Sequence, residues 1–235
     1  EFLGLITTAA QEKIDLIVAG AGFSRDIFAV GRKYGVEVVP IVSSVKLAKI
    51  SEKLGASAIV VEGTEAGGHL GTQQSIKEIL PEIVKSVNIP VIAIGRFTEP
   101  HYAELLVRQG RCDLVAFGRQ SLADPHTPQK AMEERLEDLT PCIACLQGCV
   151  ANMYAGKPIC CLVNPVLGHE KEGLPKAEKA KKVYVIGGGV AGMCAAFTAK
   201  RRGHDVTLFE ATDKLGGNMR LAAYPPGKGD ITGMI

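Results

Sequence analysis

Residues 36–63 read VEVVPIVSSVKLAKISEKLGASAIVVEG, and this stretch decides the expected fold. Its two ends, VEVVPIV (36–42) and ASAIVVEG (56–63), are short apolar runs that predict strands, and the segment between them has a helical period. The helix should end at Gly55, because glycine tolerates the left-handed conformation that closes a helix. Strands that are apolar throughout are typical of parallel strands buried on both faces. The stretch therefore predicts one strand–helix–strand unit of a parallel sheet.

The same unit recurs on both sides of this stretch. Further strands are expected at IDLIVAG (14–20), IPVIAIG (89–95) and CDLVAFG (112–118), so that the strands start about 20 to 30 residues apart. Gly35 and Gly110 are expected to end helices in the way that Gly55 does. Such a series forms either a doubly wound sheet or a (β/α)8 barrel. Glycine-rich segments after each strand favour the barrel, in which these strand ends meet at one mouth.

The expected fold class is therefore α/β, with a partial TIM barrel of the last five βα units over residues 1–138. The segments GRF (95–97) and FGR (117–119) end the last two strands. Loops at these positions of a barrel commonly bind phosphate, and arginine side chains and exposed amides suit that role. We expect a phosphate site formed by Gly95, Arg96, Phe117, Gly118 and Arg119. The alternative is that the glycines are turns and the arginines lie on the surface.

A dense group of cysteines follows the barrel, in CIACLQGCVANMYAGKPICC (142–161). Four of them, Cys142, Cys145, Cys149 and Cys161, have the spacing C-x2-C-x3-C-x11-C. A [4Fe–4S] cluster needs four thiolates that converge on one point, and this spacing suits a loop that wraps around it. We expect an iron–sulfur segment over residues 139–168.

Three other interpretations of the cysteines compete with the cluster. Zinc usually takes two CxxC pairs, and the segment has one. Disulfide frameworks are typical of small secreted proteins, and nothing in the sequence indicates secretion. A thioredoxin-like CxxC begins a helix after a strand, whereas this CxxC is expected in a loop. Cys160 beside Cys161 leaves the register of the fourth ligand open. Cys112 and Cys194 lie among apolar residues and are expected to be buried and inert.

A nucleotide motif follows a charged linker over residues 169–181. The segment KVYVIGGGVAGMCAAFTAKRRGHDVTLFEA (182–211) has a strand, then Gly187, Gly189 and Gly192, then a helix and a second strand that ends at Glu210. These glycines would let backbone amides approach a pyrophosphate at a helix N-terminus, and Glu210 would hold ribose hydroxyls. An ordinary glycine turn is the alternative. Residues 182–235 are expected to begin a Rossmann-like domain.

The bulk composition excludes several classes of protein. The 235 residues are 46% hydrophobic and 22% charged, with a formal net charge of +2. These values are ordinary for a globular protein, and they give no reason to expect nucleic acid or a membrane as partner. No signal peptide opens the chain, so we expect a cytoplasmic protein with a small-molecule substrate; a homo-oligomer remains an option. Both ends look cut, which suggests a fragment.

The first part of the chain, residues 14 to about 94, resembles the nitronate monooxygenases and the related FMN-dependent enoyl-ACP reductase of type II. The resemblance rests on VAGAGF, GVEVVPIVSSVKLAKISEKLGA and above all VVEGTEAGGHLGT (60–72). It implies that His69 is the catalytic base above the flavin and that Glu62, Gly67 and Gly68 line FMN. A neutral imidazole in a glycine-rich loop can take a proton from an acidic carbon. The alternative is a loop histidine without a role, which we expect for His101, His126, His169 and His204.

From about residue 89 onward the chain resembles the iron–sulfur subgroup of the old yellow enzymes, which includes 2,4-dienoyl-CoA reductase and trimethylamine dehydrogenase. The matching residues are IPVIAIGRFTEPHYAELLVRQGRCDLVAFGRQSLADP (89–125) and PCIACLQGC with CLVNP. This resemblance implies FMN in the barrel, a [4Fe–4S] cluster and then a dinucleotide-binding domain. The segment DKLGGNMR (213–220), with Gly216 and Gly217, resembles a second fingerprint of FAD-binding reductases and favours FAD over NAD. The change of family near residues 92–96 indicates a chimera or a fragment.

Together these resemblances imply a flavin and iron–sulfur oxidoreductase, in which electrons pass from NAD(P)H to FAD, to the cluster and to FMN. The substrate would be an activated C=C bond, as in an enoyl or dienoyl thioester. Two other functions stay open. One is nitronate oxidation with FMN and His69, and the other is an inactive cofactor-binding fragment.

Overall fold

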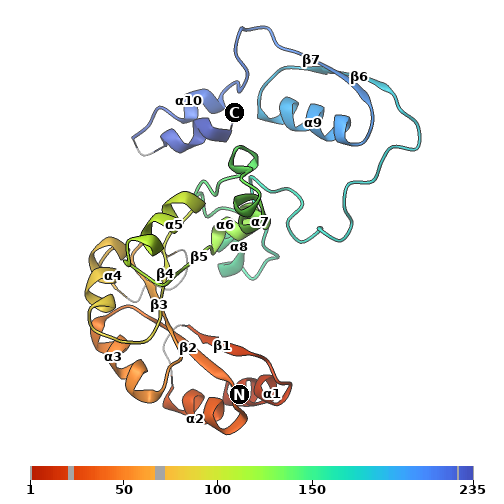
Figure 1. Cartoon of the computed structure of the whole chain (residues 1–235). Helices are drawn as coiled ribbons and strands as arrows, with labels where there is room; N and C mark the ends of the chain where they lie inside the picture. Colours follow the sequence, from red (N-terminus) through yellow and green to blue (C-terminus); the bar gives the residue numbers. More distant parts are fainter. Residues whose placement is uncertain (1, 21–23, 67–71, 227, 235) are drawn as a thin grey trace. The chain divides into compact units, whose positions relative to one another are not determined.

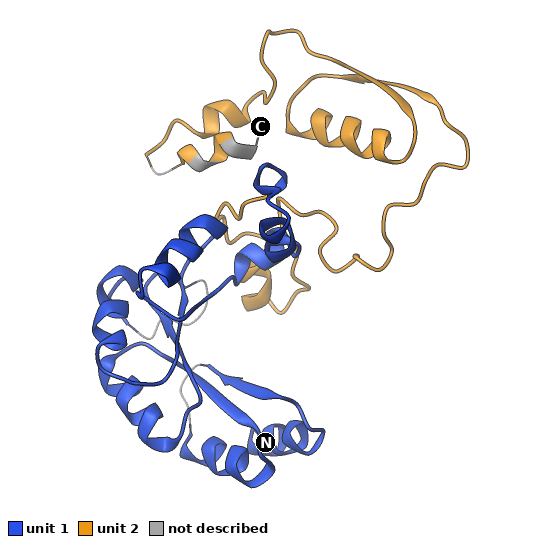
Figure 2. Ribbon diagram, viewed as in Figure 1, with its two compact units in different colours: residues 1–139 blue, residues 140–235 orange. Residues whose placement is uncertain are grey.

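The computed structural model describes residues 2–20, 24–66, 72–226 and 228–234, without the side chains of 230, 233 and 234. The chain forms two compact units, residues 1–139 and 140–235 (Figure 2). The division falls next to the boundary that we expected between barrel and cysteine segment.

Five parallel strands form the sheet of the first unit. They are β1 (Leu16–Ala19), β2 (Glu37–Val42), β3 (Ile59–Glu62), β4 (Val91–Ile94) and β5 (Leu114–Ala116). Their order in the sheet is the order in the chain, β1-β2-β3-β4-β5, and each pair is parallel. A doubly wound sheet reverses its strand order at a switch point, whereas a barrel adds each strand beside the last. The observed order therefore confirms the barrel-type winding, and all five predicted strands are present.

The helices that precede and connect the strands lie along one side of this sheet (Figure 1). They are α1 (Phe2–Gln11), α2 (Arg25–Tyr34), α3 (Val45–Leu54), α4 (Ile76–Val84) and α5 (Pro100–Arg108). Ser24 and Ser44 cap α2 and α3 by accepting backbone N–H groups of the first turn. Gly35, Gly55 and Gly110 have φ angles of 69°, 92° and 64°, which confirms the predicted left-handed helix ends.

The core of the first unit lies between these helices and the central strands. Ile59 and Val61 of β3 and Ile79 and Ile83 of α4 are at most 1% exposed. Burial of each such side chain contributes about 1.5 to 3 kcal/mol. The expectation of strands buried on both faces is correct for β2 and β3 but wrong for β1 and β5. Leu16, Val18 and Leu114 are about half exposed, because β1 and β5 are the edge strands of the described sheet.

Three short elements follow β5: α6 (Arg119–Ala123), α7 (Thr127–Met132) and a 3-10 turn, η1 (Leu136–Asp138). A buried polar network joins them. Lys130 Nζ lies 2.6 Å from Asp124 Oδ2 and also donates to the backbone oxygen of Asp138 at 2.7 Å. Gln120 donates to the hydroxyl of Thr127, and both side chains are buried. Each buried polar group in the network thus has a partner, as burial requires.

The second unit contains α8 (Val150–Tyr154), β6 (Lys182–Ile186), α9 (Val190–Arg201), β7 (Asp205–Phe209), α10 (Met219–Ala222) and η2 (Gly229–Met234). Strands β6 and β7 are parallel, and α9 connects them. Both predicted strands and the predicted helix are therefore present. No residue of α9 is buried. The prediction of a buried Cys194 is wrong, because the two described strands cover only part of this helix, whereas Cys112 is 3% exposed as predicted.

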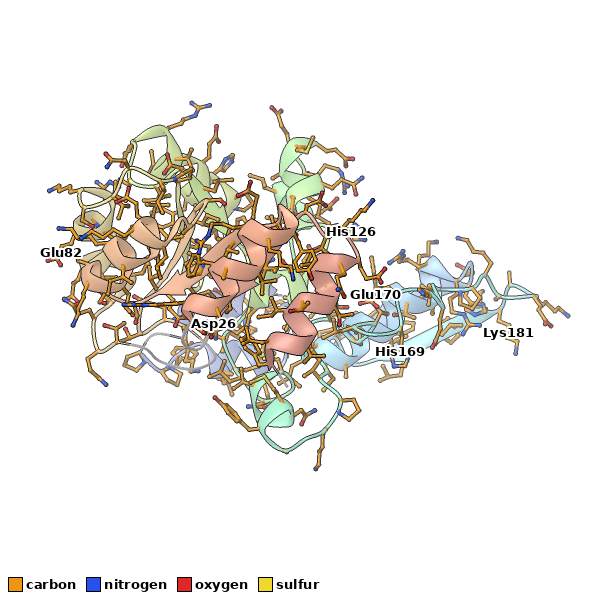
Figure 3. All side chains as sticks on the ribbon, turned by 90° about the horizontal axis from the view of Figure 1, so that it is seen from below. Asp26, Glu82, His126, His169, Glu170 and Lys181 are labelled. Atoms are coloured by element: carbon orange, nitrogen blue, oxygen red, sulfur yellow. The ribbon has the colours of Figure 1, made fainter. Side chains whose placement is uncertain are left out.

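The segment before β6 is exposed over most of its length, as its charges predicted. His169, Glu170 and Lys181, labelled in Figure 3, belong to this segment. His169 Nδ1 lies 2.9 Å from Glu172 Oε1, and this contact raises the pKa of the imidazole. The end of the segment is hydrogen-bonded to the end of α9, through Ala177 N–H to Arg202 O and Lys176 Nζ to Arg201 O. No helix in the described part of the chain is long and apolar enough to cross a bilayer.

Candidate functional site

The ends of β4 and β5 bring the two predicted phosphate segments next to each other. The strands pair in parallel from Ile92 to Ile94, opposite Leu114 to Ala116, so the chain leaves both at the same edge of the sheet. Arg96 is exposed and has a φ of 52°, a left-handed conformation that is uncommon for a residue with a side chain. Such residues direct successive N–H groups to one side and can form an anion-binding concavity.

The four remaining residues of the predicted phosphate site have different surroundings. Gly118 is exposed and is the N-cap residue of α6. Arg119 is partly buried, and its Nη2 donates to the backbone oxygen of Glu65 at 2.8 Å. Phe117 packs against the hydrophobic core. A Cβ on Gly95 would lie 3.3 Å from Ile76 Cγ2, so the chain passes close to α4 at this point. The arginines and the backbone therefore suit an anion better than Phe117 does, and phosphate binding stays a prediction.

The predicted flavin-lining segment after β3 is described only in part. Glu62 is the last residue of β3 and is partly exposed. Gly67, Gly68 and the expected base His69 lie outside the described residues. The assignment of these four residues to FMN and to catalysis therefore stays a prediction.

The cysteine loop returns upon itself. Cys160 N–H donates to Gly148 O at 2.9 Å, and a Cβ on Gly148 would lie 2.5 Å from Cys160 O. The segment that carries Cys161 is thereby held against the segment that carries Cys149. Ala144 and Leu146 have φ angles of 53° and 60°. Left-handed residues on both sides of Cys145 are typical of backbone that wraps around an anionic group, as iron–sulfur sites do.

The four predicted cluster ligands have a similar exposure to solvent. Cys142, Cys145, Cys149 and Cys161 are partly buried and none is in a disulfide, whereas Cys160 is exposed. Within residues 2–20, 24–66, 72–226 and 228–234, no three or more His, Cys, Asp or Glu side chains are grouped so that they could hold a metal ion. A cubane cluster separates its ligands more widely than a single ion does, because each thiolate binds a different iron. The donor set fits a cluster chemically, and the cluster stays a prediction.

The glycine turn after β6 shows a different physical requirement at each of its three motif positions. Gly187 has a φ of 100°, which the tight turn requires. Around the position of a Cβ on Gly189 no described atom lies within 4 Å, so the backbone is open to a ligand. A Cβ on Gly192 would lie 1.9 Å from Gly187 O, so only glycine permits this approach of helix and strand. These are the three roles that glycines have in a dinucleotide-binding turn, and the site therefore fits a dinucleotide.

Glu210 connects this turn to the segment after β7. Its carboxylate accepts the N–H of Gly188 at 2.6 Å and the N–H of Thr212 at 2.9 Å, and it also accepts the Thr212 hydroxyl. The backbone N–H of Thr212, then that of Gly188, holds the pKa of Glu210 below its ordinary value of 4.5. The predicted second fingerprint packs on the same turn, where Gly216 N–H donates to Gly188 O at 2.8 Å. A Cβ on Gly217 would lie 3.2 Å from Gly189 Cα.

Acid should loosen this turn through Glu210. A carboxylate with a lowered pKa in the folded state stabilises that state at pH values above its unfolded pKa, and the contribution is lost as pH falls through the folded pKa. We expect the protection factor of the Gly188 amide against hydrogen exchange to fall as pH drops below 4.5. In Glu210→Gln, whose side chain does not titrate, protection should be independent of pH. Equal pH dependence in both proteins would contradict the assignment.

Four residues near these sites were missed by the sequence interpretation. Thr212 follows Glu210 by two residues, and no motif marks it. Glu65 stands in the segment that carries the expected base His69, and no motif marks it either. The pattern Ser75-x-x-Glu78 is a capping box, which the structure contains at the start of α4 and which the sequence could have revealed.

A cavity of about 610 Å³ lies in the second unit and contains none of the predicted site residues. It is lined by Arg220, Leu221, Ala223, Tyr224 and Thr232.

Two family models match parts of the chain. The nitronate monooxygenase family matches residues 2–104, and the NAD(P)-binding Rossmann-like domain matches residues 185–231. The first match covers the strands of the barrel up to α5, and the second begins within β6. Both agree with the resemblances drawn from the sequence.

Individual relatives extend this picture. An NADH oxidase of Thermoanaerobacter brockii is 46% identical over 153 residues, which are 64% of this chain and 24% of that protein. A cinnamate reductase of Clostridium sporogenes is 42% identical over 156 residues, 66% of this chain and 24% of that protein. The chain therefore spans about a quarter of the length of these relatives.

One solved structure matches the fold of the whole chain. The histamine dehydrogenase of Rhizobium sp. 4-9 has a TM-score of 0.84 and 23% identity, and the match covers 100% of this chain and 43% of that protein. Both parts of the sequence, which resemble different families, are thus matched in fold by a single solved chain. The chain resembles the C-terminal part of the TIM barrel of the flavin and iron–sulfur proteins related to old yellow enzyme and 2,4-dienoyl-CoA reductase, followed by the start of an NAD(P)-binding Rossmann-like domain.

Proposed function

We propose that the chain is the cofactor-binding part of a flavin- and iron–sulfur-dependent oxidoreductase, which takes electrons from NAD(P)H and reduces an activated C=C bond. The observation that carries the proposal is the glycine turn, in which Gly187, Gly189 and Gly192 meet three separate requirements of dinucleotide binding. The cysteine loop precedes this turn and the two arginine segments precede the loop. The names of the relatives, an NADH oxidase and a cinnamate reductase, support electrons from NADH and an unsaturated substrate.

Each site has a defined task in this proposal. The amides at the start of α9 bind the pyrophosphate of FAD, and Glu210 accepts hydrogen bonds from its ribose. The thiolates of Cys142, Cys145, Cys149 and Cys161 hold the cluster. Arg96 and Arg119, with the backbone around Gly95 and Gly118, hold the FMN phosphate. When bound, FAD supplies hydride acceptance, the cluster single-electron transfer and FMN delivery of electrons to the substrate.

Anaerobic reduction tests this proposal directly. The full-length protein is reconstituted with FMN, FAD, iron and sulfide and is titrated with NADH or NADPH. We expect the flavin absorbance to bleach and a reduced-cluster signal to appear in electron paramagnetic resonance, because the three groups are held by one protein. Flavin that stays oxidised, together with the lack of a cluster signal, would contradict the relay. A protein that purifies without flavin and cannot take it up would favour the inactive fragment.

Nitronate oxidation is the second candidate, and the family match over residues 2–104 favours it. In this reaction FMN and His69 would suffice, with O2 as the acceptor. The same protein preparation, given a nitronate in air, distinguishes the two functions. Turnover that survives Cys142→Ser and Cys145→Ser but is lost in His69→Ala would favour nitronate oxidation over the relay.

A further inference from the structure

We infer that Glu65 is a positioning residue, which holds the loop after β3 and the guanidinium of Arg119 in fixed relation to the start of α4. The inference rests on the proposed function in one respect, that Arg119 binds the FMN phosphate. The role follows from two hydrogen bonds of Glu65, one to its side chain and one to its backbone oxygen, and from the backbone hydrogen bonds that hold its neighbours. None of them is expected from its place in the sequence motif, where it simply precedes the Gly-Gly-His segment.

The first contact is with the N-terminus of α4. Glu65 Oε2 accepts the N–H of Ile76, the first residue of the helix, at 2.9 Å in a partly buried position. A carboxylate at this end of a helix is stabilised by the helix dipole and satisfies an amide that has no partner within the helix. The capping box occupies other groups, since Glu78 Oε2 accepts the N–H of Ser75 at 2.9 Å. The two carboxylates thus hold neighbouring amides, but only Glu65 comes from another segment.

The second contact fixes the two ends of the β3–α4 loop against each other. Thr64 N–H donates to Gln74 O at 3.0 Å, and Ala66 N–H donates to Gly63 O at 3.1 Å. A Cβ on Gly63 would lie 2.2 Å from Ile76 N and 2.6 Å from Glu65 Oε2. The chain that leaves β3 therefore passes directly over the point where the chain enters α4.

The third contact links this loop to the end of β5. Arg119 Nη2 donates to the backbone oxygen of Glu65 at 2.8 Å, although the two residues are 54 positions apart. One side of the guanidinium is thereby oriented by the loop. A guanidinium binds an anion best when its planar group is held in place beforehand, because less side-chain entropy is then lost on binding. The position of Glu65 accordingly sets the direction in which Arg119 can meet a phosphate.

Hydrogen exchange of the full-length protein tests the link without any cofactor. We expect Glu65→Ala to raise exchange in the first turn of α4, in residues 64–66 and in residues 117–121. The matched control is Glu78→Ala, which removes a carboxylate from the same helix end. It should raise exchange in α4 alone. Glu65→Gln retains an oxygen that accepts the Ile76 amide, and it should restore protection. If Glu65→Ala and Glu78→Ala have the same exchange pattern, the inference is overturned.

Titration of the same variants with FMN, followed by flavin fluorescence, measures the functional consequence. We expect Glu65→Ala to weaken FMN binding about tenfold and Glu78→Ala to change it less than about twofold, in keeping with the loss of one oriented charged hydrogen bond. Unchanged FMN affinity in Glu65→Ala would overturn the inference. If the unmodified protein binds no FMN, the proposed function fails, and the exchange pattern alone decides the role of Glu65.

Discussion

Cys161→Ser is expected to abolish assembly of the iron–sulfur cluster, whereas Cys160→Ser is expected to leave it intact. The two cysteines are neighbours, and their order in the sequence does not tell which of them is the fourth ligand. The surroundings of Cys160 in the structure distinguish the two. Its Sγ lies 3.7 Å from Asn152 Nδ2, and the same amide group donates to Pro158 O at 3.0 Å. A Cβ on Gly148 would lie 2.9 Å from this sulfur. The thiol of Cys160 therefore faces Asn152 and Gly148.

Cys161 instead shares the partial burial of Cys142, Cys145 and Cys149. We expect its thiol to face away from Asn152, as the side chains of neighbouring residues do wherever a chain is extended. Because a cubane cluster needs four thiolates, loss of one ligand prevents its stable retention.

Iron and sulfide analysis after anaerobic reconstitution measures the difference. We expect about four iron atoms per chain in the unmodified protein and in Cys160→Ser, and less than about one in Cys161→Ser. Cys142→Ser provides a reference for complete loss. Retention of iron in Cys161→Ser together with its loss in Cys160→Ser would assign the fourth ligand to Cys160. Retention in both variants and in the reference would remove the basis for a cluster.

Two substitutions in the glycine turn should weaken dinucleotide binding for different reasons. In Gly192→Ala the new methyl group would lie 1.9 Å from Gly187 O and 3.1 Å from Gly187 C. Both are backbone atoms, so α9 must shift away from β6. We expect this variant to lose about 1 to 3 kcal/mol of stability, as overpacked sites do, together with binding.

In Gly189→Ala no described atom lies within 4 Å of the new methyl group, and the φ of −69° is ordinary. The fold should therefore be unchanged. The methyl group would instead occupy the surface along which the backbone meets a pyrophosphate, so we expect affinity for FAD to fall about tenfold or more.

Circular dichroism and calorimetric titration with FAD separate the two cases. Gly192→Ala should unfold at lower temperature and bind weakly, whereas Gly189→Ala should unfold normally and bind weakly. Gly4→Ala, in a helix and with no described atom near the added methyl group, is the matched control. It should leave FAD affinity unchanged and should not lower the unfolding temperature, because alanine favours a helix more than glycine does. Normal FAD affinity in Gly189→Ala would show that the turn does not bind a pyrophosphate at this position.

Much of the architecture could be predicted from local pattern. The apolar runs at 36–42 and 56–63 became β2 and β3, and the glycines between the elements ended the helices as expected. These features depend on a few adjacent residues, because apolar runs, the helix period and left-handed turns are local properties. The motif glycines of the nucleotide turn could be identified for the same reason.

The prediction for Cys194 failed because burial depends on what surrounds an element. The helix pattern around Cys194 is apolar, but α9 packs mainly against β6 and β7, and the thiol is exposed. Cys112 has the charged neighbours Arg111 and Asp113 and yet is buried, because the strands and helices of the first unit enclose it. Sequence pattern alone could not separate the two cases.

The sequence by itself determined the strands, the helix ends, the order of the three candidate cofactor segments and the residue types that each segment offers. Only the tertiary structure decided which of these residues meet. Arg119 bonds to Glu65 over 54 positions, Gly188 to Glu210 over 22, and the backbone of Gly148 to that of Cys160. Such contacts depend on how separate elements pack, and packing is set by the shape of the whole core, which no short segment contains.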